Sequence, residues 1–373
     1  MRNSLASMVF ISLLFQQCTQ PQESTTAEVK EDISFYTAAD FYTVKKTDAH
    51  VHLYTDNPGF ATLAKADNFS LVTITLDDVN EPPPMEAQQQ LALKQVKAFP
   101  GRVAYATTIS VRNFNSSNWQ QETIAYLKKS FDSGAVAVKI YKVIGMSLKD
   151  KAGKLVMVDD PRFDPIFNFI KQNHIPVLGH LGEPKNCWLP ANKMTIKGDK
   201  NYYTEFPIYH MYLHPEFPSY EQQIDARDHL LEKNPDLQFV GAHLGSLEWS
   251  VDELAKRLDK FPNMAVDMAA RISHLQFQSV SNRNKVRDFI IKYQDRLLYA
   301  TDDVVTASAN FADMKAGVHN TWINDWQFFT SKDTMTDADF DGSFRGLQLP
   351  KKVVDKIYRL NAEKCYPATL KLH

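Results

Sequence analysis

Two histidines separated by one residue are the first feature of this sequence that could do chemistry. His50 and His52 end a short apolar run over 42–52 that is typical of a β-strand. Because side chains alternate along a strand, both imidazoles point to the same face and can bind one metal ion. Alone, such a pair is weak evidence, so the prediction depends on whether further ligands end later strands.

Residues able to bind a metal ion or transfer a proton do end later apolar runs. They are His180, His243, Asp302 and Asp303. A lone histidine at a strand end usually only forms a hydrogen bond in its loop. Several such residues at the same end of different strands would require independent coincidences, so together they predict a metal site.

The elements that must position these residues alternate along the chain. Strands are predicted over 42–52, 71–76, 103–111, 135–143, 175–179, 238–242, 264–268 and 297–300, and helices over 85–99, 119–133, 164–173, 220–234, 251–261 and 281–293. This alternation predicts a parallel sheet with right-handed crossovers. Eight repeats favour a distorted (β/α)8 TIM barrel in a single catalytic domain over 41–373, with reactive groups at the carboxyl ends of the strands.

Composition is compatible with one large core. The chain has 373 residues, of which 44% are hydrophobic and 23% charged, with a formal net charge of −2. It therefore has no global bias toward nucleic acid, and a small-molecule substrate is the expected partner. Cys187 and Cys365 are far apart in sequence and do not indicate a disulfide scaffold.

The first 18 residues resemble a secretory signal peptide of the lipoprotein type. Arg2 precedes an apolar run over 8–15, and Cys18 is followed by a predicted polar linker over 19–40. Export to the periplasm or a bacterial membrane surface follows, with a lipid anchor at Cys18 as the expected membrane contact. Gln16 and Gln17 stand where small residues are expected, so a plain signal peptide is the alternative.

Four motifs carry a family resemblance. They are Asp-Ala-His-Val-His at 48–52, Leu-Gly-His-Leu-Gly-Glu-Pro at 178–184, Gly-Ala-His-Leu-Gly at 241–245 and Leu-Tyr-Ala-Thr-Asp at 298–302. From about Thr47 to Pro367 the sequence resembles the amidohydrolase superfamily. The closer resemblance is to its amidohydrolase-related branch, which includes metal-dependent hydrolases, lactonases and the aminocarboxymuconate semialdehyde decarboxylase group.

The resemblance implies a ligand set. His50, His52, His180 and Asp302 would bind one divalent transition metal, and three nitrogens with one carboxylate suit zinc, although manganese, cobalt or iron could replace it. Such a metal lowers the pKa of bound water from ~15.7 toward ~7. Asp302 and His243 are then the implied catalytic residues, accepting and transferring the proton.

Three further residues have two interpretations each. Lys139 either orients substrate or neutralises carboxylates at the barrel mouth, which we favour, or it is carboxylated and bridges a second metal, in which case His243 would become a ligand of that metal. Glu183 is either a proton donor, as in the deaminase group of the superfamily, or a loop acid. Arg271 either holds a substrate carboxylate bidentately or forms a surface ion pair. Asp303 is predicted to orient a ligand histidine.

Two long excursions are rich in aromatic residues and predict either pocket walls or a surface for a partner subunit of a homo-oligomer. The first, over 183–218, contains Trp188, Tyr202, Tyr203, Phe206, Tyr209, Tyr212 and Phe217, and the second, over 311–345, contains Trp322, Trp326, Phe328 and Phe329.

These observations predict a metal-dependent hydrolase that uses a metal-activated water on an ester, lactone or amide carbonyl of a small molecule. A nonoxidative decarboxylase of an unsaturated or aromatic acid is the first alternative, because the same ligands serve both reactions. A catalytically silent surface binding protein is the second, although every metal and acid/base position is filled.

Overall fold

Parallel strands form the central sheet of the computed structural model, which describes residues 34–78 and 83–366. The strands are β1 (Lys46–Tyr54), β2 (Phe69–Ile74), β3 (Val103–Thr108), β4 (Ala135–Ile140), β5 (Val177–Gly179), β6 (Phe239–Gly241), β7 (Met264–Asp267), β8 (Leu297–Leu298) and β9 (Asp303–Thr306). Their order in the sheet is β8-β7-β6-β5-β4-β3-β2-β1-β9. Each predicted strand overlaps an observed one. The first begins later than predicted, because Ala38–Tyr42 forms a short 3-10 helix, η1.

The eighth strand is interrupted and closes the barrel. Both β8 and β9 belong to it. The segment 299–302 between them forms hydrogen bonds with β1 on one side and with the residues after β7 on the other. The amide of Asp302 donates to the carbonyl of His50 on β1 at 2.8 Å, and the amide of Ala270 beyond β7 donates to the carbonyl of Thr301 at 3.0 Å. Asp302 interrupts the strand with a left-handed backbone, φ 71. The predicted distorted (β/α)8 barrel is therefore confirmed.

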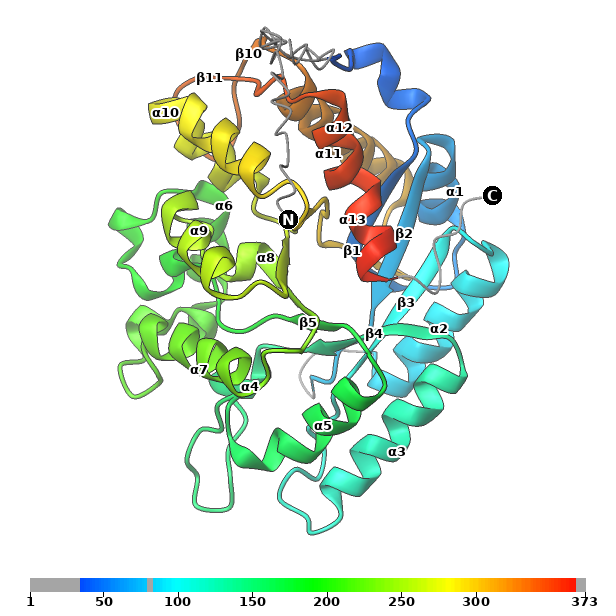
Figure 1. Cartoon of the computed structure of the whole chain (residues 1–373), viewed down its shortest axis with the longest axis vertical. Coiled ribbons are helices and arrows are strands. Elements are labelled where there is room, and N and C mark those ends of the chain that lie inside the picture. Colours follow the sequence, from blue (N-terminus) through cyan, green and yellow to red (C-terminus); the bar gives the residue numbers. More distant parts are fainter. Residues whose placement is uncertain (1–33, 79–82, 367–373) are drawn as a thin grey trace, which may run out of the picture. The chain divides into compact units, whose positions relative to one another are not determined.

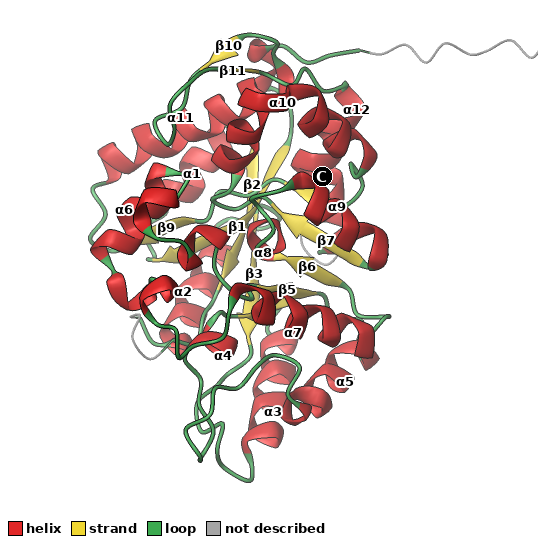
Figure 2. Ribbon diagram, turned by 90° about the vertical axis from the view of Figure 1, so that its left-hand side faces the viewer, coloured by secondary structure: helices red, strands yellow, loops and turns green. Residues whose placement is uncertain are grey.

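Helices surround the strands (Figures 1 and 2). The longer ones are α1 (Gly59–Ala66), α2 (Met85–Ala98), α3 (Trp119–Asp132), α5 (Asp164–Gln172), α6 (Lys197–Glu205), α7 (Tyr220–Lys233), α9 (Val251–Lys260), α10 (Ile272–Lys292) and α11 (Phe311–Thr330). Short helices are α4 (Val143–Met146), α8 (Ala242–Gly245), α12 (Lys351–Asp355), α13 (Asn361–Cys365), η2 (Pro161–Phe163) and the π-helix η7 (Lys356–Leu360), and a separate hairpin joins β10 (Thr334–Met335) to β11 (Phe344–Arg345).

The predicted helix over 281–293 starts too late, because α10 begins at Ile272. Asn282 interrupts it with non-helical angles, φ −153 and ψ 81. The Asn282 side chain then accepts a hydrogen bond from the amide of Lys285 at 3.0 Å, as an N-cap does. The sequence signal near 281 therefore marked the second half of a kinked helix. Helix α1 was not predicted.

The aromatic residues of the second excursion lie in the core. Trp322, Trp326, Phe328 and Phe329 are all buried. Trp322, on α11, stacks on Phe69 of β2 with ring centroids 4.3 Å apart. The prediction that these rings wall a pocket or meet a partner is wrong, because one face of α11 packs them against the barrel.

The first excursion folds as a series of short helices. Besides α6 it contains η3 (Lys185–Trp188), η4 (Ala191–Lys193), η5 (Pro207–Tyr209) and η6 (Met211–Leu213). Buried Tyr203 and Met211 form a small apolar cluster with Cys187 and Met146, separate from the main core. This local core gives the excursion a fixed shape beside the barrel mouth. Both described cysteines, Cys187 and Cys365, are free.

Residues 34–40 of the predicted linker contact the barrel domain. The Tyr36 hydroxyl donates to Asp355 at 2.8 Å, and the Trp326 indole donates to the Thr37 carbonyl at 3.0 Å. The predicted signal peptide, Cys18 and linker residues 19–33 lie outside the described residues. Within the described part of the chain, every helix is too short or too polar to cross a bilayer.

Candidate metal centre

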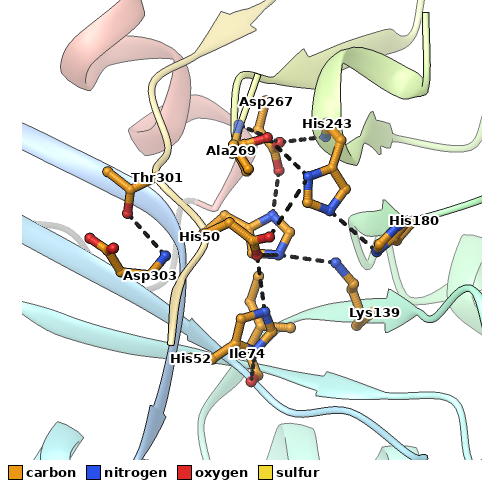
Figure 3. A network of polar contacts seen from close by, with 12 residues as sticks. His50, His52, Ile74, Lys139, His180, His243, Asp267, Ala269, Thr301 and Asp303 are labelled. Atoms are coloured by element: carbon orange, nitrogen blue, oxygen red, sulfur yellow. Dashed lines mark hydrogen bonds and ion pairs between the residues drawn. The ribbon is translucent and has the colours of Figure 1, made fainter. Parts of the chain in front are cut away.

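His50 and His52 lie within β1, which continues to Tyr54, two residues beyond its predicted end, and each imidazole has a hydrogen-bond partner at Nδ1. His50 Nδ1 lies 2.9 Å from a carboxylate oxygen of Asp267, and His52 Nδ1 lies 3.1 Å from the carbonyl oxygen of Ile74 (Figure 3). These acceptors place the proton on Nδ1 of each ring, which leaves the Nε2 lone pair for a ligand. Both Nε2 atoms approach Asp302 Oδ1, at 3.2 Å from His50 and 3.3 Å from His52.

His243 and His180 complete the cluster from β6 and β5. His243 Nδ1 lies 2.9 Å from the carbonyl oxygen of Ala269, so its Nε2 also faces inward, where it lies 3.2 Å from His180 Nδ1. Among the described residues, His50, His243 and Asp302 have donor atoms that all lie within 4.8 Å of one another. The structure places His243, to which the sequence assigned proton transfer, beside the predicted ligands, with its Nδ1 4.0 Å from Asp302 Oδ2.

The donor set fits a divalent transition metal. His180 Nε2 is buried without a hydrogen-bond partner, and the carboxylate of Glu183 lies 3.8 Å away, beyond hydrogen-bond distance. A buried nitrogen of this kind is costly unless something binds it. Imidazole nitrogens and one carboxylate are ligands that zinc and its neighbours prefer. The residues present therefore suit the metal that the sequence predicts.

The protonation states also suit metal binding, which needs neutral imidazoles and an ionised carboxylate. Burial lowers the pKa of His50, and it lowers the pKa values of His180 and His243 well below the ordinary value. Burial alone would raise the pKa of Asp302, but interactions with His243 and His50 outweigh it and hold that pKa well below its usual value.

Lys139 reaches the centre from β4. Its side chain is completely buried, and Nζ lies 3.1 Å from His50 Nε2. Burial lowers its pKa to about 8, although Asp267 and Asp302 act in the opposite direction. The Lys139 amine therefore lies beside the carboxylates of the cluster, a position that is compatible with both interpretations that the sequence left open.

Asp267 is a site residue that the sequence reasoning missed. It ends β7, is fully buried, and accepts a hydrogen bond from the His243 amide at 2.8 Å through Oδ1 while Oδ2 contacts His50. One carboxylate thus fixes two histidines of the cluster. The sequence did offer one indication: Asp267 is the last residue of the seventh strand, and His180 and His243 likewise come at the ends of the fifth and sixth strands.

Replacing Asp267 with asparagine is expected to weaken metal affinity ~10- to 100-fold, the usual loss when a ligand's supporting carboxylate is removed. The amide keeps the volume but loses the charge that fixes the His50 tautomer. Metal competition with a chromophoric chelator measures the change. Asp259→Asn, at an exposed carboxylate on α9, is the control, and equal affinities for the two variants would contradict the assignment.

Asp303 does not contact a histidine among the described residues. Its amide donates to Thr301 Oγ1 at 3.2 Å, and its Oδ2 is buried without a hydrogen-bond partner. Thr301 is held in turn by Asp48, whose two oxygens accept from the threonine amide and hydroxyl at 3.0 and 2.7 Å. Orienting a histidine, which the sequence assigned to Asp303, is therefore done by Asp267.

A cavity of about 630 Å³ opens over the cluster. Its inner wall includes His52, His180, His243, Lys139 and Asp302. The two excursions supply much of the outer wall: Glu183, Asp199, Tyr202 and Tyr203 from the first, and Thr321, Asp325, Asp337 and Asp339 from the second. The prediction that the first excursion walls a pocket therefore holds for its two adjacent tyrosines.

Arg271 and Glu183 both line this cavity. Arg271 is buried, and its Nε has no hydrogen-bond partner, whereas one Nη donates to the Ala270 carbonyl at 2.8 Å. Burial alone would lower its pKa, but the charges of Asp199 and Glu248 raise it. The side chain of Glu183 forms a close ion pair with Lys142. Glu183 is thus paired, which differs from both a free loop acid and an available proton donor.

The fold and this site define a (β/α)8 barrel protein that gathers histidines and carboxylates at the carboxyl ends of its strands. The chain belongs to the amidohydrolase family, which it matches over residues 47–368. The predicted superfamily resemblance is therefore confirmed, and family membership supports an enzyme. Comparison with curated proteins gives no match.

Solved structures of amidohydrolases are also similar. An amidohydrolase from Mycobacterium avium subsp. paratuberculosis has a TM-score of 0.42 and 12% identity, covering 83% of this chain and 76% of that one. An amidohydrolase from Bifidobacterium longum subsp. infantis has a TM-score of 0.41, 13% identity and coverage of 87% and 99%. One from Pseudomonas aeruginosa has a TM-score of 0.41, 9% identity and coverage of 90% and 99%.

Proposed function

We propose that this protein is a metal-dependent hydrolase of an uncharged ester, lactone or amide. The observation that carries the proposal is the convergence of buried histidines on Asp302 at the floor of a cavity large enough for a small molecule. His50, His52, His180 and Asp302 would hold the metal, which we propose to be zinc, with His243 adjacent. When bound, it would polarise the carbonyl and activate a water for attack.

The chain's own residues would move the proton. Asp302 is ionised and can accept a proton from the attacking water. The Ala269 carbonyl fixes the tautomer of His243, which lines the cavity, and its unprotonated Nε2 can receive that proton or pass it to the leaving group. Lys139 would stabilise negative charge that develops on the substrate oxygen.

Cavity charge favours hydrolysis of an uncharged substrate over decarboxylation. Each of the three cations that line the cavity already faces carboxylates: Lys139 faces Asp267 and Asp302, Lys142 pairs with Glu183, and Arg271 faces Asp199 and Glu248. Two further carboxylates, Asp337 and Asp339, line the outer wall together with Asp325, whose pKa burial raises to about 7. A substrate carboxylate would have to compete with these carboxylates for the cations of the cavity.

Arg271 supports the second candidate, a nonoxidative decarboxylase. Its buried Nε has no partner and could hold a substrate carboxylate. Release of carbon dioxide from an unsaturated or aromatic acid without net uptake of water would favour this reaction.

A substrate panel tests the proposal. Purified protein, with metal content measured by mass spectrometry, is incubated with uncharged lactones, esters and amides and with unsaturated and aromatic acids, in ¹⁸O-labelled water. We expect about one metal per chain and ¹⁸O in the products of uncharged substrates, lost on chelation and restored by zinc. Carbon dioxide from the acids alone would overturn the proposal, as would ligand binding without turnover, which would indicate a binding protein.

Two earlier predictions stay predictions. Export and lipidation at Cys18 concern residues outside the described part of the chain. Association into a homo-oligomer likewise stays open.

A further inference from the structure

The turn that carries His243 has an unusual backbone. Four consecutive residues after Ala242 are left-handed: His243 at φ 59, Leu244 at φ 56, Gly245 at φ 61 and Ser246 at φ 56. Residues with a Cβ avoid this region because the Cβ approaches the following carbonyl oxygen, and runs of such residues are rare. The turn therefore needs support from its surroundings.

Glycines at both ends let the turn fold back onto β6. A Cβ on Gly241 would lie 2.9 Å from the Cα of Gly245, and a Cβ on Gly245 would lie 3.0 Å from the Met264 side chain. The backbone segments touch because neither glycine has a side chain. This contact explains the spacing of Gly-Ala-His-Leu-Gly.

Two side chains of α7 hold the C-terminal end of the turn by hydrogen bonds. The Tyr220 hydroxyl donates to the Ser246 carbonyl, and Arg227 Nη1 donates to the Gly245 carbonyl, each at 2.5 Å. Both side chains are buried. Asp228 fixes the guanidinium by accepting from Nε and Nη2 at 3.0 and 2.6 Å. Neither Tyr220 nor Arg227 lines the cavity.

The near end of the turn is held from β7. Asp267 accepts from the His243 amide at 2.8 Å, and the Ala269 carbonyl lies 2.9 Å from His243 Nδ1. The strained turn is thus fixed at both ends, and His243 Nε2 points at the cluster. Without the hydrogen bonds at either end, the turn could relax toward a less strained backbone, and the His243 imidazole would rotate with it.

We propose that Tyr220 and Arg227 are positioning residues, which hold the left-handed turn and through it aim the His243 imidazole. The inference rests on the proposed function only where turnover is measured.

Tyr220→Phe is the principal test, because it removes one hydroxyl and keeps the ring, whereas a substitution of Arg227 would leave Asp228 buried without its partner. We expect kcat to fall roughly 10- to 100-fold, the effect of a small misplacement, with KM changed less than about twofold. Adding Ser246→Gly should bring kcat back to that of Ser246→Gly alone, since glycine adopts the left-handed region freely. The single variant is the reference because the substitution also removes the Ser246 hydroxyl, which donates to the Leu181 and Gly182 carbonyls at 3.1 and 3.3 Å.

Nuclear magnetic resonance provides a readout that needs no substrate. The His243 Nδ1–H signal, assigned by its loss in His243→Gln, should be sharp in the parent protein, weaken by exchange with water in Tyr220→Phe and return in the double variant. Tyr105→Phe is the matched control, because Tyr105 is also buried and donates to a backbone carbonyl, that of Ser130, at 2.8 Å.

Three results would overturn the proposal: an unchanged His243 signal in Tyr220→Phe, equal effects of Tyr220→Phe and Tyr105→Phe, or a double variant that stays as impaired relative to Ser246→Gly as Tyr220→Phe is relative to the parent. If no substrate of the panel is turned over, the proposed hydrolase fails, whereas the signal still decides whether Tyr220 positions His243.

Discussion

His50→Ala is expected to lose its metal and, with it, turnover by ~10³-fold or more, since a catalytic metal contributes several kcal/mol of transition-state stabilisation. The ring lies at the middle of the cluster. Its Nδ1 is fixed by Asp267, and its Nε2 approaches Asp302 and Lys139. Removing it also leaves the buried Asp267 carboxylate without a partner. Metal content by mass spectrometry and steady-state kinetics on the best substrate of the panel measure the two losses.

His229→Ala is the matched control, because the His229 side chain is 61% exposed on α7, where its Nδ1 lies 3.4 Å from the carboxylate of Asp159. It should keep the metal and the kcat of the parent. A His50→Ala protein that is folded, retains a full complement of metal and turns over at the parent rate would refute the proposed centre.

Lys139→Met is expected to lower kcat ~10- to 100-fold while the metal content stays at about one per chain. Methionine keeps most of the volume but removes the cation that faces Asp302 and Asp267, and an interaction with a charged group is worth ~1.5–3 kcal/mol. Kinetics and metal analysis of the same preparations give the result. One metal in both proteins would support a lysine that acts on substrate and carboxylates.

Lys46→Met is a matched control for this second substitution. Lys46 is equally buried but lies outside the cavity, where Nζ donates to the Val44 carbonyl at 2.9 Å and lies 4.3 Å from the ring centre of Phe41. It should lower the unfolding temperature and leave metal content and kcat unchanged. Two metals in the parent and one in Lys139→Met would instead indicate a carboxylated lysine that bridges two ions.

Much of the fold could be predicted because buried elements have recognisable patterns of apolar residues in the sequence. Strands buried on both faces appear as continuous apolar runs, such as Ala135–Ile140, and the helices between them have amphipathic spacing. The start of α10 could not be predicted in this way, because the cap at Asn282 resembles the start of a separate helix. Equally, the aromatic residues of α11 look the same in sequence whether they wall a pocket or fill a core.

The candidate site was predictable to the extent that its residues end strands. His180, His243 and Asp302 meet for that reason, since parallel strands of a barrel end at one mouth, whereas His50 lies inside β1, which continues to Tyr54. Asp267 escaped notice because a single carboxylate carries no motif, and its importance arises only from its distance to His50 and His243. The charge balance of the cavity was equally hidden, because Asp199 and Asp339 come from segments far apart in sequence.

The sequence by itself determined the barrel, the family and the residues that gather at its mouth, because periodicity and strand-end position are local properties. Only the tertiary structure decided which nitrogen of each histidine faces inward, which cations are already paired and how the turn of His243 is held. Those properties depend on hydrogen bonds between elements distant in sequence, such as the contacts of α7 with the turn after β6. The His50 and His52 pair thus indicated the chemistry, and its partners fix the geometry in which that chemistry can occur.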